Sequence, residues 1–402
     1  MSNAIAIKEC TLCQAELQLV LALAPTPLAN EFLPLEADKE LFPLNLMQCK
    51  KCHHLQLDTE VNMFRLFKHY TYTSNTSSSN YNYLHAYATQ MYHQFMPNFV
   101  VDVGGNDGTF LHFFQQLGSK VLNVDPAENI VEIAKNNNID SECVFFNELN
   151  AVDIKVKHGQ ADLITCNNMF AHNRDLTEVL KGVKWLLAEK GTFVIEVSYA
   201  AKMLQHNLFD LIYHEHLHHW HLRPLYTFLL KYDLWMYDAE VIEQTHGGSL
   251  RVYVKHAGKQ MVQSERLIKL LDNERLNFAE LVDNFKNNVQ LIKENLTNML
   301  TGIKGLGKQI GILGYPAKMC TVSYYLGLDQ FICNIYDNNP LKIGKYSHQG
   351  MLIEDAANIY KNKPDYLLIG SWNYQNELMQ RYSLFAKTGG HFITTFPELK
   401  VV

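Results

Sequence analysis

The sequence predicts an α/β protein of more than one domain, and three observations support this fold class. Twice, from Phe99 and again from Gln309, an apolar strand runs into a glycine-containing turn and then into an apolar helical pattern. Such strand–turn–helix units are typical of parallel sheets covered by helices. A pair of C-x-x-C turns near the start indicates a separate small segment. The length of 402 residues fits two or three domains.

The composition excludes several classes of protein. Lysine plus arginine (35) against aspartate plus glutamate (41) gives a formal charge of −6, so the chain lacks the general cationic field that recruits nucleic acid or anionic membrane. No apolar run approaches the roughly 20 residues that span a bilayer. The apolar stretch 17–24 has no basic region before it, so it does not resemble a signal peptide. We therefore expect a cytoplasmic protein with a small-molecule substrate.

Four of the eight cysteines form two C-x-x-C turns, Cys10 with Cys13 and Cys49 with Cys52. Each turn points two thiolates at one centre, and two turns supply the four soft ligands of a tetrahedral Zn²⁺ ion. Four cysteines leave no position for water, so the zinc would be structural. A redox pair or four buried thiols are the alternatives. The other cysteines stand singly in apolar runs and are expected in the core.

The first glycine turn follows the apolar run 99–103 and predicts a nucleoside ligand. Glycines there let backbone amides approach a ligand closely. The turn is not G-x-G-x-x-G, which weakens a dinucleotide interpretation. The next apolar strand ends in Asp125, about 20 residues after the turn, where a carboxylate can accept both hydroxyls of a ribose.

Further strands are expected at 161–166 and 191–197, and the stretch 236–255 predicts two antiparallel strands around Gly247 and Gly248. Parallel strands closed by such a hairpin resemble class I methyltransferases that use S-adenosylmethionine (SAM), whereas dehydrogenases lack the hairpin. In the last third, apolar residues at helical spacing from Phe278 to Leu296 predict one long helix that ends near Gly302. The second glycine turn then precedes Lys318, which could contact a diphosphate or could be a solvated surface lysine. Strands are expected at 331–336 and 365–369.

A histidine-rich stretch at 213–221 is the most unusual part of the sequence, and three interpretations stay open. His214-Glu215-His216-Leu217-His218 matches H-E-x-x-H, which on a helix would bind a catalytic zinc with Glu215 as base. The stretch could also be a histidine-rich surface turn. In the third interpretation, one imidazole is a general base beside a methyl donor, because the pKa of histidine lies near working pH.

Several blocks, taken in order, give the chain an almost end-to-end resemblance to the sugar C-methyltransferases that act on nucleotide-linked keto-deoxysugars, the TylCIII and tetronitrose 3-C-methyltransferase type. The blocks are residues 27–30, 103–111, 168–172, 193–197, 209–216, 246–251, 336–342 and 371–373, with a tyrosine- and serine-rich stretch that includes His69, Tyr70, Thr71 and Tyr72. The resemblance departs at His219, Trp220 and His221, where the family usually carries tyrosine, phenylalanine and serine. That departure leaves a non-sugar acceptor open.

The resemblance implies a class I methyltransferase Rossmann-like domain flanked by a small zinc-binding N-terminal domain and a second Rossmann-like C-terminal lobe that helps hold the nucleotide-sugar. We place the zinc-binding domain at 1–68, the SAM-binding domain at 69–258, and the linker helix with the C-terminal lobe at 259–402. The cofactors implied are SAM and structural Zn²⁺.

The resemblance also implies roles for particular residues. His216 is the expected base, with Tyr213, Glu215 and His172 around it and Tyr72 closing the pocket, although Tyr72 could be a packed aromatic and His172 a core histidine. Glu215 is expected to orient the base. The expected SAM contacts are Gly104, Gly105, Asn106, Asp107, Gly108, Phe110, Asp125, Pro126 and Asn168. The expected substrate contacts are Tyr70, His214, Lys318, Asn338, Trp372 and Asn373.

The chemistry that follows is methylation of carbon beside a ketone. Such a carbon is acidic because the enolate places charge on oxygen, so a base must take the proton while donors stabilise the oxyanion. The carbanion then attacks the methyl group of SAM without a metal or a covalent intermediate. The rival functions are methylation of a non-sugar small molecule, a zinc-ribbon module fused to a methyltransferase that acts on RNA or protein, and a zinc metallohydrolase that uses His214, Glu215 and His218.

Overall fold

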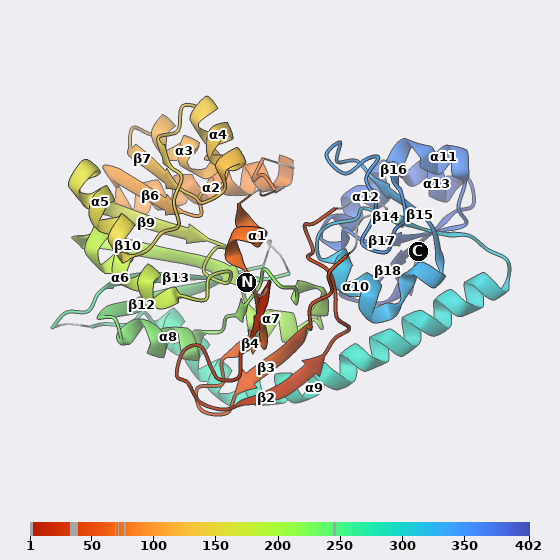
Figure 1. Ribbon diagram of the computed structural model, residues 1–402, viewed down its shortest axis with the longest axis horizontal. Helices are drawn as coiled ribbons and strands as arrows, with labels where there is room; N and C mark the ends of the chain where they lie inside the picture. The colour runs from red at the N-terminus through yellow and green to blue at the C-terminus, as the bar shows by residue number, and fades with distance from the viewer. Residues whose placement is uncertain are drawn as a thin grey trace.

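A computed structural model describes residues 3–32, 39–68, 70, 72–75, 78–243, 247–259 and 261–402. Of the sequence motifs above, His69, Thr71 and His246 lie outside the described residues. Figure 1 shows a methyltransferase-like sheet at one side, a second α/β lobe at the other, and the long helix α9 (Glu265–Gly305) running beneath both. The N-terminal strands lie between the two lobes, against the first half of α9.

The N-terminal lobe is built from short antiparallel strands around the cysteine turns. β1 (Ala4–Ala6) pairs with β5 (Thr59–Val61) as a two-stranded ribbon. A four-stranded sheet has the order β11-β4-β3-β2. Its strands β2 (Leu17–Ala22), β3 (Asn45–Cys49) and β4 (Leu55–Leu57) come from this lobe, while β11 (His218–His219) comes from the histidine-rich stretch. A segment from the middle of the chain therefore completes the N-terminal sheet, and helix α1 (Met63–Phe67) ends the lobe.

The middle of the chain forms a seven-stranded sheet with the order β12-β13-β10-β9-β6-β7-β8. All neighbours are parallel except β13, which is antiparallel to both β10 and β12. The strands are β6 (Phe99–Val103), β7 (Lys120–Val124), β8 (Ser141–Glu142), β9 (Ala161–Asn167), β10 (Leu187–Ser198), β12 (Leu234–Ile242) and β13 (Ser249–His256). A reversed strand inserted next to the last parallel one is the class I methyltransferase topology. The expected α/β fold and its terminal hairpin are confirmed.

Helices cover both faces of this sheet, and apolar side chains explain why the central strands are buried. β6 is buried along its whole length, which is typical of a parallel strand with helices on both sides. The helices are α2 (Ser78–Phe95), α3 (Thr109–Gln116), α4 (Glu128–Asn136), α5 (Glu148–His158), α6 (Leu176–Leu186), α7 (Ala200–Gln205) and α8 (Leu222–Leu230). Between α7 and α8 the short 3₁₀ turn η1 (Phe209–Leu211) leads into the histidine-rich stretch.

Helix α9 links the two α/β lobes, as its apolar spacing predicts. Ser264 caps its first turn by accepting a hydrogen bond from the Leu267 amide. The helix begins at Glu265, about three and a half turns before the apolar pattern at Phe278, because Leu267 and the buried carboxylate of Glu274 also face the protein. Its end at Gly305 agrees with the expected end near Gly302.

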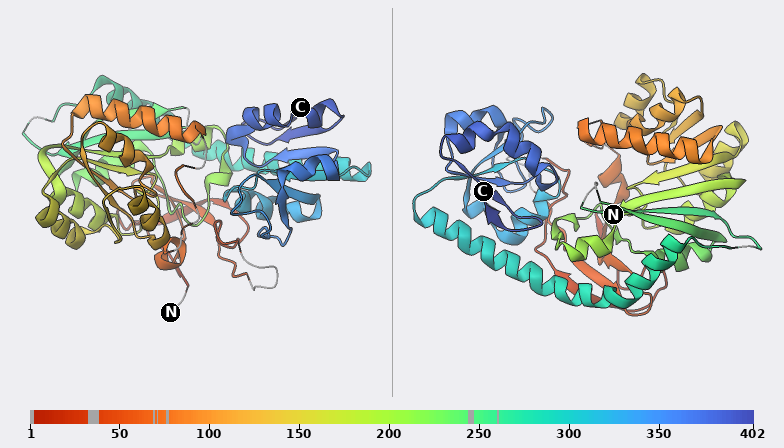
Figure 2. Two further views of the ribbon diagram at one scale, coloured as in Figure 1. Left: turned by 90° about the horizontal axis from the view of Figure 1, so that it is seen from above. Right: turned by 180° about the vertical axis from the view of Figure 1, so that it is seen from behind.

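The C-terminal lobe is a second, smaller Rossmann-like unit, drawn in blue and seen from above and from behind in Figure 2. Its sheet has the order β16-β15-β14-β17-β18-β19, parallel except for the last strand. The strands are β14 (Ile310–Leu313), β15 (Ile332–Asp337), β16 (Ile353–Asp355), β17 (Tyr366–Ile369), β18 (His391–Thr394) and β19 (Lys400–Val401), and the helices are α10 (Met319–Leu326), α11 (Ile359–Asn362), α12 (Gln375–Arg381) and α13 (Ser383–Lys387).

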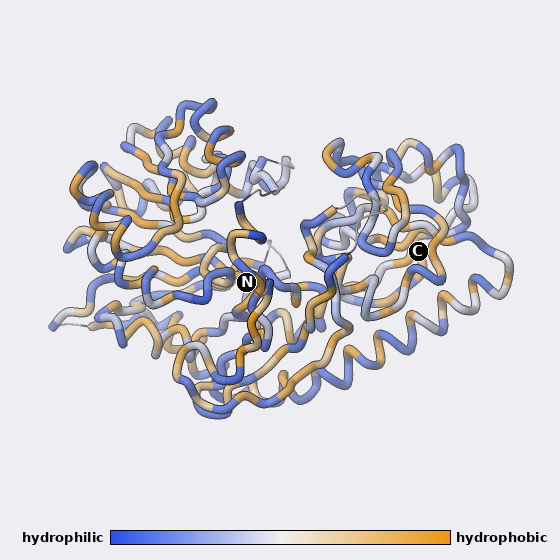
Figure 3. The backbone as a smooth tube through the Cα atoms, viewed as in Figure 1, coloured by the Kyte–Doolittle hydropathy of each residue, from blue (hydrophilic) through white to orange (hydrophobic). Residues whose placement is uncertain are grey.

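One apolar core joins the lobes. It runs from Leu46 and Leu57 of the N-terminal sheet through Phe209, past Phe285 of α9, to Ile312 in the C-terminal sheet. The hydropathy pattern of Figure 3 follows the same layers, with apolar strands inside and polar helix surfaces outside. No helix in the described part of the chain is both long enough and apolar enough to cross a bilayer.

Candidate active site

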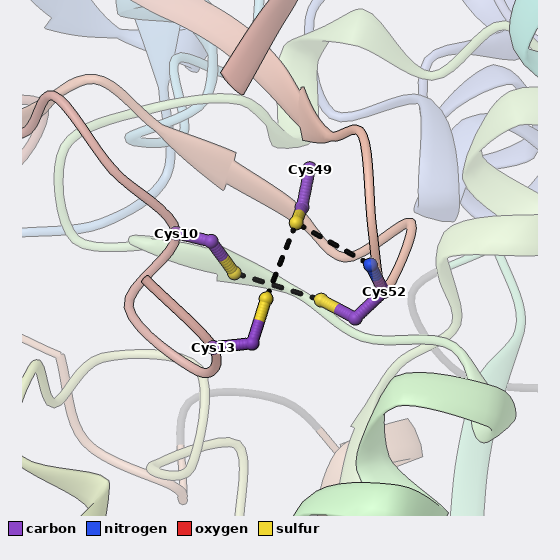
Figure 4. A group of neighbouring side chains, drawn as sticks. All are labelled: Cys10, Cys13, Cys49 and Cys52. Atoms are coloured by element: carbon purple, nitrogen blue, oxygen red, sulfur yellow. Dashed lines mark hydrogen bonds between the residues drawn. The ribbon is translucent and has the colours of Figure 1, made fainter. Parts of the chain in front are cut away.

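The two C-x-x-C turns converge on one point in the N-terminal lobe (Figure 4). The four sulfur atoms lie within 4.8 Å of one another, with Cys10 3.6 Å from Cys52 and Cys13 3.4 Å from Cys49. A tetrahedral ion with Zn–S bonds of about 2.3 Å has sulfur–sulfur edges of about 3.8 Å. The cluster therefore fits Zn²⁺ closely. Within the described residues it is the one group of three or more potential ligands that converges in this way.

The backbone explains how each turn holds its thiolates. Gln14 and His53 follow the second cysteine of each turn, and both have positive φ values of 58° and 63°. Their amides donate to the carbonyl oxygens of Cys10 and Cys49, which closes each turn. The amides of Lys51 and Cys52 also donate to Sγ of Cys49, at 3.4 Å each. Such N–H groups stabilise a thiolate, the form that binds metal.

A cavity of about 910 Å³ lies between the carboxyl ends of the methyltransferase-like sheet and the C-terminal lobe. Most of the predicted site residues line it. They are Gly104, Gly105, Asn106, Phe110, Asp125, Pro126, Asn168, His172, Tyr70, Tyr72, Tyr213, His216, Lys318, Asn338 and Asn373. Asp107, Gly108, His214, Glu215 and Trp372 lie behind its wall.

The glycine turn after β6 brings backbone close to the cavity. A Cβ atom on Gly105 would lie 2.5 Å from Oδ1 of Asn123, and Gly104 has a φ of 75°. Asp125 directly follows β7. Its Oδ2 accepts a hydrogen bond from the Asn106 amide at 3.1 Å, and its Oδ1 accepts one from the Ala127 amide at 2.9 Å. Asp125 lines the cavity, and each carboxylate oxygen can accept a second hydrogen bond. Burial raises the pKa of Asp125.

Asp107 and Gly108 hold the turn rather than face the cavity, which corrects their predicted ligand contacts. Oδ1 of Asp107 accepts the amide of Thr109 at the start of α3, and Oδ2 accepts the amide of Asn75. Gly108 has a φ of 76° and precedes the helix, where its Cβ would approach Ile139 within 2.9 Å. Both residues therefore stabilise the turn without lining the cavity.

The histidine-rich stretch is neither a surface turn nor an H-E-x-x-H metal site. His214, His218, His219 and His221 are buried. Nε2 of His214 donates to the carbonyl of Pro43 at 3.0 Å, and its ring packs edge-on against Phe42. His218 donates to the carbonyl of Asn173 and accepts from His54 at 2.9 Å. Because these rings are committed to packing in separate places, the metallohydrolase interpretation and the substrate contact predicted for His214 are wrong.

His216 turns the other way, into the cavity. Its Nδ1 lies 2.9 Å from the carbonyl of Leu211, which can only accept, so this nitrogen carries the proton. In the neutral ring Nε2 is then an acceptor, and the Tyr213 hydroxyl donates to it at 2.8 Å. The ring of His172 lies 5.2 Å away. Burial lowers the pKa of His172 to about 4, and its Nε2 has no hydrogen-bond partner among the described residues.

Glu215 does not take the orienting position expected of it. The Leu211 carbonyl holds Nδ1 of His216, while the Glu215 carboxylate accepts from Asn30 at 2.7 Å and from the Tyr70 hydroxyl at 3.0 Å. Burial raises the pKa of Glu215 to about 7. Glu215 and His216 thus have different partners, and Glu215 holds the segments that carry Asn30 and Tyr70. Tyr72 is 42% exposed at the cavity mouth.

The C-terminal lobe contributes Lys318 from its glycine turn. Nζ of Lys318 lies 3.1 Å from Oδ2 of Asp210 and 2.8 Å from Oδ1 of Asn373. The ammonium also lies 3.8 Å from the ring centre of Trp372. Trp372 itself donates from Nε1 to Asp210 at 2.5 Å, which corrects its predicted substrate contact to a supporting one. Asn338, at the cavity wall, accepts from the Tyr382 hydroxyl.

Sequence reasoning missed a buried ionic network on the methyltransferase-like side. The Arg251 guanidinium is 2% exposed and pairs with Glu196 at 2.8 Å. It also donates to the Tyr83 hydroxyl at 2.9 Å and lies 3.5 Å from the ring centre of Tyr87. Glu196, Tyr83 and Tyr87 line the cavity. Glu196 and Arg251 stand in two of the family-like sequence blocks, which was the one available signal for them.

Side chains of opposite formal charge line the two ends of the cavity, and two of them are paired behind its wall, Glu196 with Arg251 and Lys318 with Asp210. Among its described wall residues, the methyltransferase-like end has three carboxylates (Asp102, Asp125 and Glu196) and no lysine or arginine. The C-terminal end has four cationic residues (Lys318, Lys342, Lys345 and Arg381) against two carboxylates (Asp337 and Glu377). Burial raises the pKa of Asp102 to about 7. The cavity can thus take a cationic ligand at one end and an anionic one at the other.

Comparison with known proteins gives matches along almost the whole chain. Family models match residues 10–67 (putative zinc binding domain), 81–238 (methyltransferase domain) and 244–397 (C-methyltransferase C-terminal domain). The C-methyltransferase NovU of Streptomyces niveus is 30% identical over 98% of this chain and 97% of its own length. The chain belongs to the C-methyltransferases. It is a SAM-dependent enzyme with a zinc-binding domain, as the sequence predicts.

The chain is also similar to several solved structures, each over less than half of its length. A SAM-dependent methyltransferase of Clostridium acetobutylicum is 14% identical, with a TM-score of 0.37 over 44% of this chain and 92% of its own. Another from Anabaena variabilis is 16% identical, with a TM-score of 0.33 over 39% of this chain and 76% of its own. Membership of the C-methyltransferase family rests on NovU and the family models instead.

Proposed function

We propose that this C-methyltransferase transfers the methyl group of SAM to the carbon beside the ketone of a nucleotide-linked keto-deoxysugar, with His216 as the base. The observation that carries the proposal is one cavity that joins the carboxylates around the glycine turn after β6 to the lysines of the C-terminal lobe, with an acceptor imidazole nitrogen in its wall. SAM is a cation, whereas a nucleoside diphosphate is an anion. The charge at each end of the cavity suits one of these ligands.

The proposed base is Nε2 of His216. Because the Leu211 carbonyl keeps the proton on Nδ1, Nε2 carries the lone pair; that lone pair now accepts from the Tyr213 hydroxyl and would take the substrate proton once this hydroxyl turns to the substrate oxygen. Tyr213 lies against the same nitrogen, so it could in principle relay the proton. Burial and the nearby charge of Glu215 raise the pKa of Tyr213 well above 10, however. The phenol therefore keeps its proton, and its proposed role is to donate to the enolate oxygen while His216 takes the carbon-bound proton.

His172 is the second proposed oxyanion donor. Its low pKa keeps the ring neutral, so it can offer one N–H without adding a charge that would compete with the developing imidazolium of His216. Tyr70 and Tyr72 are proposed to close the acceptor pocket at its mouth. Holding the acceptor carbon and the methyl donor in contact supplies much of the remaining rate enhancement.

The proposed SAM contacts are Gly104, Gly105, Asn106, Phe110, Asp125, Pro126 and Asn168. SAM supplies an electrophilic methyl group when bound. Asp125 would accept the ribose hydroxyls with the lone pairs that the amides of Asn106 and Ala127 leave free. At the other end, Lys318, Asn338 and Asn373 are proposed to face the nucleotide. The division into domains at 1–68, 69–258 and 259–402 stays a prediction.

The Gly105→Ala variant tests the position of the cofactor. The new methyl group would crowd Oδ1 of Asn123 and Oδ2 of Asp102, at 2.5 and 3.0 Å, so the turn must shift. We expect the Kd for SAM to rise by about 10-fold, equivalent to about 1.4 kcal/mol, in isothermal titration. Gly302→Ala in α9 is the matched control, because nothing lies within 4 Å of its added Cβ. Equal SAM affinity in the two variants would place the cofactor elsewhere.

A non-sugar acceptor was open because of the departure at His219, Trp220 and His221. Those side chains are buried behind the cavity, where Trp220 donates to the Phe170 carbonyl and His221 pairs with Glu274. Trp220 and His221 thus support the segment from behind, while the His219 ring lies edge-on to that of His216 at 6.3 Å, so a non-sugar acceptor stays the alternative.

A thermal-shift screen of SAM with a panel of nucleoside diphosphates tests the substrate class. We expect SAM and at least one nucleoside diphosphate to raise Tm together, by more than either does alone. A methyl-transfer assay with the keto-deoxysugar of the same nucleotide should then give a C-methylated product. A panel in which no nucleoside diphosphate binds would contradict the proposal.

A further inference from the structure

The residues just before His216, from Asp210 to Ile212, are held by the C-terminal lobe. Asp210 in η1 is 1% exposed. Its Oδ2 accepts a hydrogen bond from Nε1 of Trp372 at 2.5 Å and forms an ion pair with Nζ of Lys318 at 3.1 Å. Both donors belong to the C-terminal lobe. Two residues on, the carbonyl of Ile212 accepts the Thr321 hydroxyl of α10 at 2.7 Å.

Leu211 stands between these two anchored residues, and its carbonyl is the acceptor that fixes the tautomer of His216. The C-terminal lobe thus controls the backbone on both sides of that carbonyl. A small rotation of the Leu211 peptide would remove the acceptor from Nδ1, and the proton could then move to Nε2, where it blocks the base.

Lys318 is shared between Asp210 and the cavity. Two of its contacts are Asp210 and Asn373, and its side chain also lines the cavity beside the other lysines. Oδ1 of Asp210 has no hydrogen-bond partner among the described residues, so the carboxylate is held through Oδ2 alone. The Lys318 ammonium can therefore bridge Asp210 and an anion bound at this end of the cavity, which links that anion to the carboxylate that anchors η1.

We propose that Asp210 is a positioning residue, which couples anion binding at Lys318 in the C-terminal lobe to the tautomer and orientation of His216. The inference rests on the proposed function in that His216 is taken as the base. It adds that the acceptor's anionic end is sensed through Lys318, Asp210 and the Leu211 carbonyl. The lobe that holds the nucleotide would thereby also tune the base.

The test observes the His216 ring directly in the full chain. With ¹⁵N-labelled histidine, the His216 signals are assigned by their loss in His216→Asn and recorded with and without inorganic pyrophosphate as the anionic probe. In the wild type we expect the Nδ1–H form without ligand and a shift of both ring nitrogens on adding pyrophosphate. Pyrophosphate that binds, by isothermal titration, without moving the His216 signals would overturn the proposal, as would its failure to bind.

Asp210→Asn keeps an acceptor for Trp372 but removes the charge that pairs with Lys318. We expect pyrophosphate still to bind this variant while the His216 signals no longer respond, and kcat to fall by about 10²-fold with an unchanged Kd for SAM. A His216 response equal to that of the wild type would refute the coupling. Should Asp210→Asn fold poorly, Trp372→Phe leaves Lys318 paired with Oδ2 of Asp210, so the His216 response to pyrophosphate should be at least as large as in the wild type; a lost response in this variant would refute the coupling through Lys318.

Lys308→Met is the matched control, since Lys308 forms a comparable 2.8 Å ion pair with Asp365 on the outer side of the same lobe. It should leave the response intact. The two proposals fail separately. An unchanged His216 response in Asp210→Asn refutes the coupling alone, whereas full methyl transfer by His216→Asn refutes the base itself.

Discussion

Replacement of His216 by asparagine is expected to lower kcat by about 10²–10⁴-fold, the contribution typical of a positioned general base. Asparagine can still donate to the Leu211 carbonyl, but it offers no basic nitrogen where Nε2 now stands. The Kd for SAM should change little, because the glycine turn and Asp125 belong to other elements of the sheet. Steady-state methyl transfer and isothermal titration with SAM measure the two effects separately.

His391→Asn is the control for this substitution. His391 is exposed on β18 and stacks on Tyr366, far from the cavity wall. It should retain wild-type kcat. If His216→Asn kept more than about a tenth of wild-type kcat, a tenfold effect of only 1.4 kcal/mol would be too small for the loss of the base.

Replacement of Cys49 by serine is expected to remove the zinc ion and unfold the N-terminal lobe. Structural zinc binds with about 10–16 kcal/mol in small domains at pH 7, which is comparable to the whole stability of a typical domain. Cys49 ends β3, and β4 begins soon after the second cysteine turn. Because β4 pairs with β11, directly after the His216 turn, we expect kcat to fall as well.

Metal analysis should find one zinc per wild-type chain and none in Cys49→Ser, with faster proteolysis confined to the N-terminal lobe. SAM should still bind, since the glycine turn lies in the other sheet. Cys333→Ser is the control and should keep its zinc, because Cys333, like Cys143, is exposed and not in the core as its sequence context predicts. A Cys49→Ser variant with a full complement of zinc would disprove the assignment of the cluster.

Local patterns in the sequence were enough to predict the fold. The apolar strand before Gly104, the break at Gly247 and Gly248, and the helical spacing from Phe278 each depend on neighbouring residues alone. The cysteine cluster could likewise be predicted from spacing. The sharing of β11 between the N-terminal sheet and the middle of the chain could not, because a two-residue strand has no periodicity of its own.

Site residues were predicted less completely, because their positions depend on contacts between distant parts of the chain. His214 and His216 are two residues apart and similar in sequence context, yet one packs against Phe42 and the other faces the cavity. Trp372 approaches Asp210 from another lobe. The pair Glu196 and Arg251 comes together only when β10 and β13 align, a register that spacing does not specify.

Hydrogen exchange at the acceptor carbon tests the central claim most directly. The enzyme is incubated in D₂O with the keto-deoxysugar nucleotide and S-adenosylhomocysteine, which cannot donate a methyl group, and deuterium is followed by mass spectrometry. We expect the wild type to exchange one hydrogen beside the ketone and His216→Asn to exchange it at least about 10²-fold more slowly. Equal exchange rates in the two proteins would contradict the account.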